Sequence, residues 1–85
     1  MKLKKTFVTH NVAGNPVLVS ADSSFNGMIR ANGTGGEIIE LLKKETTVDE
    51  VVDAMLERYD ASREVIEADV VAVIEQLRGI GAIEE

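Results

Sequence analysis

The chain has 85 residues, a net charge of −6 at pH 7 and no cysteine. A chain of this length suits one domain with a modest core, and it leaves little room for a deep substrate cavity as well. The lack of cysteine excludes disulfides, zinc thiolate sites, iron–sulfur clusters and thiol nucleophiles. Because nucleic-acid-binding proteins usually neutralise phosphates with a basic face, the acidic composition also argues against nucleic acid as a partner.

The N-terminal residues Met-Lys-Leu-Lys-Lys are basic, but no apolar signal core follows them. No apolar run approaches the length of about 20 residues that spans a membrane. We therefore expect a cytoplasmic protein without membrane contact. The chain shows no internal repeat or linker, so residues 1–85 are expected to form one domain, with residues 1–5 flexible.

Three short strands are predicted in the first third of the chain. Residues 7–12 mix β-branched and polar side chains, and residues 17–19 are Val-Leu-Val. Between them, Ala-Gly-Asn-Pro at residues 13–16 predicts a turn, since Gly and Asn tolerate positive φ and Pro fixes its own φ. A polar loop over residues 20–26 then leads to a third short strand over residues 27–31. Consecutive short strands of this kind imply an antiparallel meander.

The rest of the chain carries signals for three helix starts. Thr34 and Glu37 have the spacing of a capping box, in which two side chains satisfy each other's free backbone amides. Thr47 and Glu50 repeat the pattern. Ser62 is predicted to cap a third helix through its hydroxyl group.

Apolar residues at helical spacing follow each predicted cap. These stripes comprise Ile38, Leu41 and Leu42 in the first helix, Val48, Val51, Val52, Met55, Leu56 and Tyr59 in the second, and Ile66, Val70, Val73, Ile74 and Leu77 in the third. Gly79 and Gly81 are predicted to end the third helix, and residues 82–83 to form a short closing strand. The order βββααα with a closing strand is that of an α+β domain.

The third helix has a second, partly apolar flank beside its core stripe. At about 100° per residue, this flank contains Val65, Ala68, Asp69, Ala72 and Gln76. Such a flank either covers a neighbouring element of the same protein or forms the wall of a groove. The residue pattern alone leaves both interpretations open.

No residue pattern points to catalysis. His10 is the only histidine, and without a second histidine or a cysteine it lacks partners for metal binding or acid–base work. The helical glutamates lie on predicted solvent-facing surfaces, without the apolar surroundings of a catalytic carboxylate. The glycine-rich residues 32–36 lack the Gly-Lys-Ser/Thr ending of a phosphate-binding loop. We therefore expect a protein that is not an enzyme and that holds no metal or cofactor.

The third predicted strand is a candidate for pairing with another chain. A three-stranded meander leaves at least one edge, whose unpaired backbone groups can accept an added strand unless the protein's own third helix or tail covers them. Strands followed by three helices also fit a winged-helix regulator that binds DNA or protein. Its third helix would then read the major groove, although that helix is net acidic and the phosphates would repel it.

An ordered set of short motifs runs from Phe25 to the end of the chain. It consists of Phe25-Asn26-Gly27-Met28-Ile29, Asn32-Gly33-Thr34-Gly35, the apolar residues of the first helix, Thr47-Val48-Asp49-Glu50, Leu56-Glu57-Arg58-Tyr59, Asp69-Val70, Leu77 and Gly81-Ala82-Ile83. In this order and spacing the set resembles the PqqD-like family, the peptide chaperones known as RiPP recognition elements. Family members often place an apolar residue just before the Asn-x-Thr-Gly motif and Ala after it, where this chain has Ala31 and Gly36.

The resemblance implies a winged-helix-like α+β domain, with a three-stranded antiparallel sheet followed by three helices and no catalysis of its own. It also implies that the leader of a ribosomally made precursor peptide binds by strand addition between the third strand and the third helix. A modifying enzyme, such as a radical-SAM maturase or a cyclodehydratase, would then receive the peptide. The strand residues carried over are Gly27, Met28, Ile29, Arg30, Ala31 and Asn32. On the helix, the helical wheel selects Val65, Asp69, Ala72, Val73 and Gln76.

Two matters stay open in the sequence. Both a monomer and a dimer are compatible with an open edge strand and a small core. A winged-helix regulator that binds DNA or another protein, or a scaffold that only orders a partner enzyme, would use the same elements for a different function.

Overall fold

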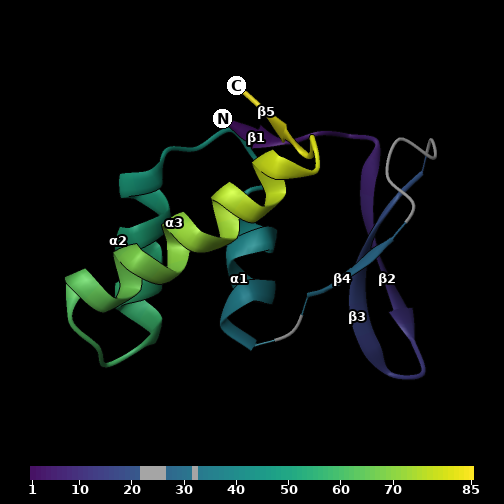
Figure 1. Ribbon diagram of the computed structural model, residues 1–85. Coiled ribbons are helices and arrows are strands. Elements are labelled where there is room, and N and C mark those ends of the chain that lie inside the picture. Colours follow the sequence, from purple (N-terminus) through teal and green to yellow (C-terminus); the bar gives the residue numbers. More distant parts are fainter. Residues whose placement is uncertain (22–26, 32) are drawn as a thin grey trace.

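The computed structural model describes residues 1–21, 27–31 and 33–85 of the chain. The elements in chain order are β1 (Lys2–Leu3), β2 (Phe7–Val12), β3 (Asn15–Ser20), β4 (Met28–Arg30), α1 (Gly33–Leu41), α2 (Val48–Arg58), α3 (Arg63–Gly79) and β5 (Ile83–Glu84). Figure 1 shows two layers, with the sheet of β2, β3 and β4 on one side and the three helices on the other. The predicted α+β arrangement, an antiparallel meander followed by three helices, is confirmed.

The turn between β2 and β3 is shorter than the sequence predicts. Val12 pairs with Asn15, so the turn consists of Ala13 and Gly14 alone, with φ angles of 52° and 84°. Positive φ at both positions is the mark of a type I′ turn, whose twist matches that of the strands on either side. Asn15 and Pro16, predicted as part of the turn, belong to β3 instead.

Replacing Ala13 with Asn is expected to stabilise the protein. Alanine in the left-handed region is strained, whereas Asn tolerates it and creates the Asn-Gly pair that this turn type prefers, a gain of roughly 0.5–1 kcal/mol in the free energy of unfolding. Urea denaturation measures the difference. Ala21→Asn is the matched control, because Ala21 is also exposed but has no positive φ. A lower stability for the Ala13 variant than for the control would contradict the strain at Ala13.

The first helix, α1, begins two residues earlier than predicted, since a cap at Thr34 would make Gly35 its first residue. Gly33 is already part of the helix and has a φ of 59°, which glycine adopts without strain. Thr34, predicted to cap the helix together with Glu37, therefore lies inside the first turn. The turn into the helix falls at Gly33, so residue 34 no longer has the extended backbone that a capping threonine requires.

The other two helix starts are confirmed. The hydroxyl of Thr47 accepts a hydrogen bond from the backbone N–H of Glu50 at 3.2 Å. The hydroxyl of Ser62 accepts one from the backbone N–H of Val65 at 3.3 Å. The carboxylate of Glu50 accepts instead from the hydroxyl of Thr46 at 3.4 Å, so half of the predicted capping box at α2 is formed.

The end of α3 is closed by backbone hydrogen bonds around Gly81. The helix ends at Gly79, and Gly81 has a φ of 76°. The N–H of Gly81 donates to the carbonyl of Arg78 at 3.0 Å, and the N–H of Ala82 donates to that of Leu77 at 2.9 Å. These two bonds define a Schellman motif, with Ala82 and Leu77 both buried beside it. The motif directs the chain into β5, the predicted closing strand.

The N-terminal residues contain a strand, although the sequence predicts flexibility there. β1 pairs antiparallel with β5, with Leu3 opposite Ile83. The N–H of Leu3 donates to the carbonyl of Leu42 at 2.7 Å, and the Leu3 side chain is 5% exposed. Figure 1 shows the two chain ends side by side at one end of the molecule. A pairing of only two residues leaves no periodicity for sequence analysis to detect.

The core lies between the sheet and the helices and follows the predicted stripes. The buried residues of α2 and α3 are Val51, Val52, Met55, Ile66, Val70, Ile74 and Leu77. Val73, also predicted as core, is only half buried and packs against the edge of this cluster. Within the described ranges, the core contains no buried polar or charged residue, and none of the helices is both long and apolar enough to cross a bilayer.

Candidate functional site

The strand β4 forms one edge of the sheet. The strand order β2-β3-β4 leaves two outer edges, and in the described part of the chain β4 pairs with β3 only. The sequence predicts that a three-stranded meander has at least one edge, and the third strand was the candidate. It gives no strand order, so it did not identify β2 as the second edge. Both edges offer backbone groups for pairing.

One hydrogen bond fixes which backbone groups of β4 point outward. The N–H of Ala31 donates to the carbonyl of Pro16 at 2.9 Å, and Ile29 lies opposite Leu18 in the same ladder. In an antiparallel pair, alternate residues direct both backbone groups to the partner strand. Ala31 and Ile29 therefore face β3, whereas Met28 and Arg30 direct their N–H and C=O groups to the outer edge. An added strand would meet these groups.

The side chains of residues 29–31 alternate between the core and the solvent. Ile29 is half buried and packs against the core, and Ala31 is buried. Arg30 is exposed, as is Gly27 just before the strand. The face of β4 that carries Ile29 is therefore the one that turns toward the helices. Asn32, also predicted as a binding residue, lies outside the described residues.

The predicted flank of α3 turns away from α2. On its α2 side, Arg63 of α3 forms ion pairs with Asp53 at 2.8 Å and with Asp49 at 3.6 Å. The exposed flank residues lie about 120–180° around the helix axis from Arg63, and they are Val65, Asp69, Ala72 and Gln76. Val73 is half buried at the border of this flank and packs against the same core as Ile29.

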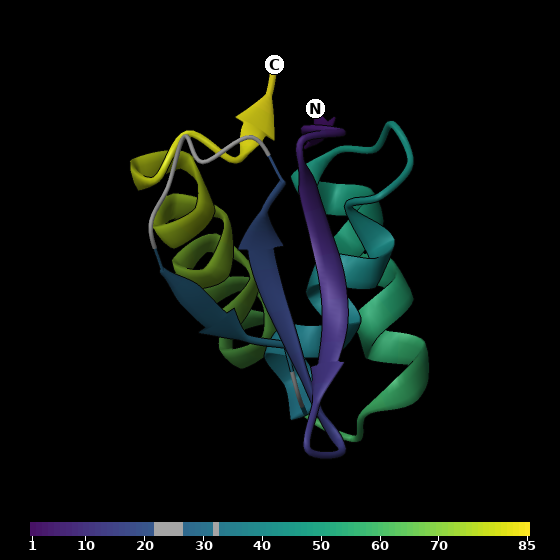
Figure 2. The ribbon, with the colours of Figure 1, turned by 90° about the vertical axis from the view of Figure 1, so that its right-hand side faces the viewer.

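The flank of α3 and the edge of β4 lie on the same side of the molecule. Figure 1 shows α3 and β4 in front of the other elements, and Figure 2 shows β4 as the strand of the sheet nearest to α3. We call this region the β4–α3 surface, defined by residues 27–31 and by Val65, Asp69, Ala72, Val73 and Gln76. The two segments that the sequence selected separately therefore lie on the same side of the molecule, and the later turns of α3 are nearer to the sheet than its start.

Exposed ion pairs lie on α3 outside this surface. A hydrogen bond from Arg63 to Asp53 is the main cause that raises the pKa of the Arg63 guanidinium, and a hydrogen bond to Glu85 does the same for the pKa of Arg78. These pairs are exposed, so each adds little to stability. Among the described residues, neither Arg30 nor Asp69 on the β4–α3 surface forms an ion pair, so both remain open to a ligand.

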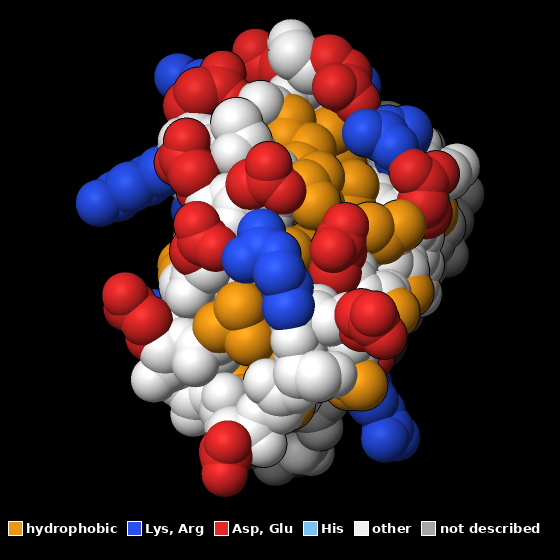
Figure 3. Space-filling view, turned by 90° about the vertical axis from the view of Figure 1, so that its left-hand side faces the viewer, with side chains coloured by type: hydrophobic (Ala, Val, Ile, Leu, Met, Phe, Trp, Pro, Cys, Tyr) orange, Lys and Arg blue, Asp and Glu red, His pale blue; other side chains and the backbone are white. Residues whose placement is uncertain are grey.

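The helical side of the molecule is acidic. Figure 3 shows Asp and Glu side chains spread over this face, around an apolar region. The exposed acidic residues of α2 and α3 are Asp49, Glu50, Asp53, Glu57, Glu64, Glu67, Asp69 and Glu75. A face of this sign would repel the phosphates that flank a DNA groove. Within the described ranges, no three His, Asp or Glu side chains gather in a way that could hold a metal ion.

Comparison with known proteins relates this chain to a family. The family model described as Coenzyme PQQ synthesis protein D (PqqD) matches residues 16–83. A solved structure, described as TbiB1 in complex with the TbiA(beta) leader peptide, has a similar fold, with a TM-score of 0.76 and 24% sequence identity over 99% of this chain and 95% of that one. No match is found among curated protein sequences. Because the family match runs from β3 through every helix to β5, the chain belongs to the PqqD family.

Proposed function

We propose that this protein is a non-catalytic RiPP recognition element that binds the leader of a ribosomally made precursor peptide and presents it to a modifying enzyme. The observation that carries the proposal is the open outer edge of β4 beside the partly apolar flank of α3. Membership of the PqqD family supports it. The similar fold of TbiB1, a protein described in complex with a leader peptide, supports it further.

The leader adds to the sheet as a strand. Its backbone pairs with the outward N–H and C=O groups of Met28 and Arg30, which supplies affinity for any extended peptide. Alternate side chains of the leader then point toward the flank of α3, where Val65, Ala72 and Val73 provide apolar contact. These side-chain contacts set the register and the selectivity of binding. By holding the leader, the protein raises the effective concentration of the peptide's core at the enzyme.

Several finer features belong to the same proposal. The partner enzyme is a peptide-modifying enzyme such as a radical-SAM maturase, and the protein acts in the cytoplasm, as a monomer or dimer, without a cofactor or nucleic acid. The acidic faces of α2 and α3 argue against the alternative of a DNA-binding regulator. The winged-helix-like assignment comes from the family resemblance, and in this chain the sheet precedes all three helices.

The direct test is a titration of the ¹⁵N-labelled protein with the leader of a short peptide encoded beside its gene. Leader recognition predicts amide shifts that concentrate on residues 27–31 and on residues 65–76, with a Kd of micromolar order. Shifts confined to other elements would contradict the β4–α3 surface as the binding site. No shifts in the presence of the partner enzyme would contradict leader binding itself.

Replacing Val65 with Asp is expected to weaken leader binding about tenfold, or ~1.4 kcal/mol, because a carboxylate would face the apolar side chains of the bound leader. Val71→Asp is the matched control on the same helix, about 120° away around its axis. Val65 is 55% exposed and Val71 is 41% exposed, so both variants should fold. Isothermal titration calorimetry compares the two. Equal weakening of leader binding by the two variants would mean that the leader does not contact this flank of α3.

A further inference from the structure

The lysines of this acidic protein are gathered in one place. All five occur in two short segments of the sequence, and they are Lys2, Lys4, Lys5, Lys43 and Lys44. The fold brings these segments together around a cavity of about 300 Å³ beside β2, lined by Leu3, Lys4, Lys5, Phe7, Val8, Thr9 and Lys43. An adjoining hollow of about 380 Å³ is lined by Lys2, Lys4, Lys5, Thr6 and Glu84. We call the region of Lys2, Lys4, Lys5 and Lys43 the lysine face.

The charge of the lysine face is only partly balanced by the protein itself. Lys43 forms an ion pair with Glu40 at 2.7 Å, whereas Lys4 and Lys5 form none with any described residue. In contrast, each of the three helical arginines pairs with carboxylates of its own chain. Among the described residues, the exposed Glu84 is the only acidic one that lines either cavity. Two unpaired ammonium groups are therefore available to an acidic ligand.

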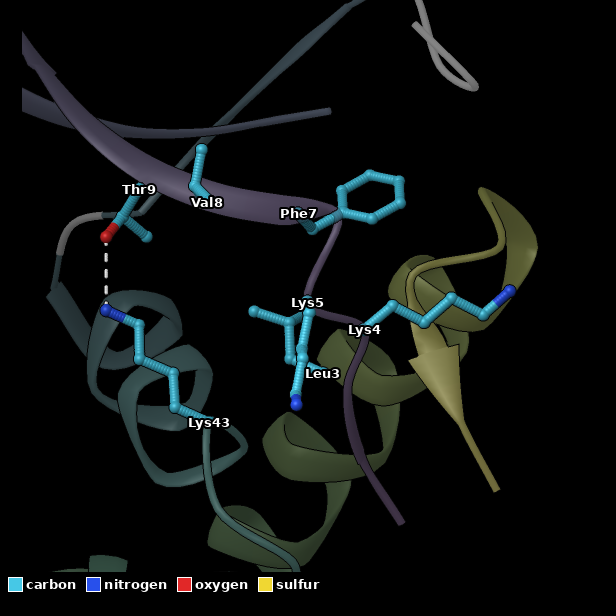
Figure 4. Close-up of a pocket in the computed structure, with 7 residues that line it drawn as sticks. All are labelled: Leu3, Lys4, Lys5, Phe7, Val8, Thr9 and Lys43. Carbon is cyan, nitrogen blue, oxygen red and sulfur yellow. Dashed lines mark hydrogen bonds between the residues drawn. The ribbon is translucent and has the colours of Figure 1, made fainter. Parts of the chain in front are cut away.

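The cavity combines these charges with an apolar floor. Leu3 and Phe7 are buried at its base, whereas Figure 4 shows the half-buried Val8 pointing to the other face of β2. Figure 4 shows Lys43 reaching from the segment after α1 to β2, where its Nζ donates to the Thr9 hydroxyl at 3.1 Å. A cavity of this size accepts one apolar side chain, and Lys4 and Lys5 are among the residues that line it. Figure 4 shows the Lys4 side chain extending toward β5, where Lys4 also lines the adjoining hollow. The chemistry fits an apolar residue flanked by carboxylates.

The outer edge of β2 runs along the same cavity. The N–H of Ala21 donates to the carbonyl of Thr6 at 2.6 Å, which fixes the alternation of the ladder. Val8 and His10 therefore direct their backbone groups to β3, and Thr9 and Asn11 direct theirs outward. Within the described ranges, these outward groups have no hydrogen-bond partner. An extended segment could thus pair with β2 while its side chains reach the lysine face.

We propose that the lysine face and the outer edge of β2 dock an acidic, extended segment of the modifying enzyme. The inference rests on the proposed function, which requires a leader and an enzyme to be held at the same time. β2 and β4 are opposite edges of one sheet, so both partners bind without competing. The enzyme segment pairs with Thr9 and Asn11, places an apolar side chain in the cavity, and sets one carboxylate against Lys5 and another against Lys4 in the adjoining hollow.

Two other occupants fit the surface less well. A nucleic acid has no backbone that pairs with a strand edge, and the net charge of −6 would repel its phosphates. A second copy of this chain carries many of its acidic residues on α2 and α3, and a helix cannot add to a sheet as a strand. An acidic segment in extended conformation pairs its carboxylates with the lysines and its backbone with the outer edge of β2.

The test uses a peptide with the repeating order Glu-Thr-Val-Thr, which places Glu and Val on the same face of an extended strand, and a Gln-for-Glu counterpart. Each peptide is titrated into the ¹⁵N-labelled full chain. The acidic peptide should shift the amides of Thr9, Asn11 and Lys43, and the Gln peptide should bind about tenfold more weakly. Lys5→Glu should also weaken binding of the acidic peptide about tenfold. Lys4→Glu is a second variant with the same expectation.

Arg30→Glu is the matched control, because it changes the net charge equally but lies at the β4 edge. It should leave binding of the acidic peptide within about twofold, whereas Lys5→Glu should leave leader binding within about twofold. Loss of leader shifts at β4 with intact acidic-peptide shifts at β2 would overturn the proposed function alone. The reverse result would overturn only the docking surface.

Three further results would overturn the docking proposal. If the Gln peptide bound as tightly as the acidic peptide, the lysines would have no role in recognition. Tighter binding of a ten-nucleotide single strand than of the acidic peptide would assign the face to nucleic acid. Self-association that Lys5→Glu abolishes would assign it to a second copy of the chain.

Discussion

Gly36→Ala is expected to lower the free energy of unfolding by about 2–3 kcal/mol. Gly36 is buried in α1, and a Cβ atom there would lie 2.1 Å from the backbone carbonyl oxygen of Ala31. That oxygen belongs to the main chain, so it cannot move aside as the end of a flexible side chain could. Either α1 or the end of β4 must shift. Urea denaturation of the variant measures the loss of stability.

Gly35→Ala is the matched control for this prediction. Gly35 is the preceding residue of the same helix, but a Cβ there meets nothing within 4 Å. Ala favours helix over Gly, so this variant should be more stable by roughly 0.5–1 kcal/mol. We therefore expect the free energy of unfolding to fall in the Gly36→Ala variant and to rise in the Gly35→Ala variant. A Gly36→Ala variant as stable as the native protein would mean that the Ala31 carbonyl oxygen does not lie where a Cβ at residue 36 would meet it.

Arg30→Pro is expected to weaken leader binding about 30- to 100-fold, or ~2–3 kcal/mol. The N–H of Arg30 points to the outer edge, so proline removes no hydrogen bond between β3 and β4. It does remove a donor from the added strand, and its ring occupies the space where that strand would lie. Proline is tolerated on edge strands in this orientation, so the variant should fold. Calorimetric titration with the leader gives the Kd.

Arg30→Ala separates the backbone from the side chain in this experiment. The alanine variant keeps the N–H and loses the charge, so we expect its Kd to rise no more than about threefold. If Ala and Pro weaken binding equally, the guanidinium rather than the strand edge carries recognition. A leader that binds the proline variant as tightly as the native protein would rule out strand addition at β4.

Local signals made the helices predictable from the sequence. The caps at Thr47 and Ser62 act within one turn, and the apolar stripes of α2 and α3 follow the helical period over several turns. The strands of the meander are bounded by turn residues, which also act locally. The flank of α3 followed from the same helical wheel, and its role in binding remains a prediction.

The features that the sequence did not predict depend on contacts between distant residues. β1 forms a strand because Leu3 meets Ile83 and Leu42 in the fold. The two sheet edges depend on strand order, and the lysine face depends on two segments about 40 residues apart that meet only after folding. The sequence predicts a cap at Thr34, whereas α1 begins at Gly33. Both residues can start a helix, and the direction in which the chain leaves β4 decides between them.

The pairing of β1 with β5 also has a kinetic meaning. It joins the second and third residues of the chain to residues 83 and 84, so the loop that it closes contains almost the whole protein. Closing so long a loop has a high entropic cost, which is repaid only once the elements between the two strands are in place. Folding should therefore proceed through the sheet and helices first, and the joining of the two chain ends should complete it.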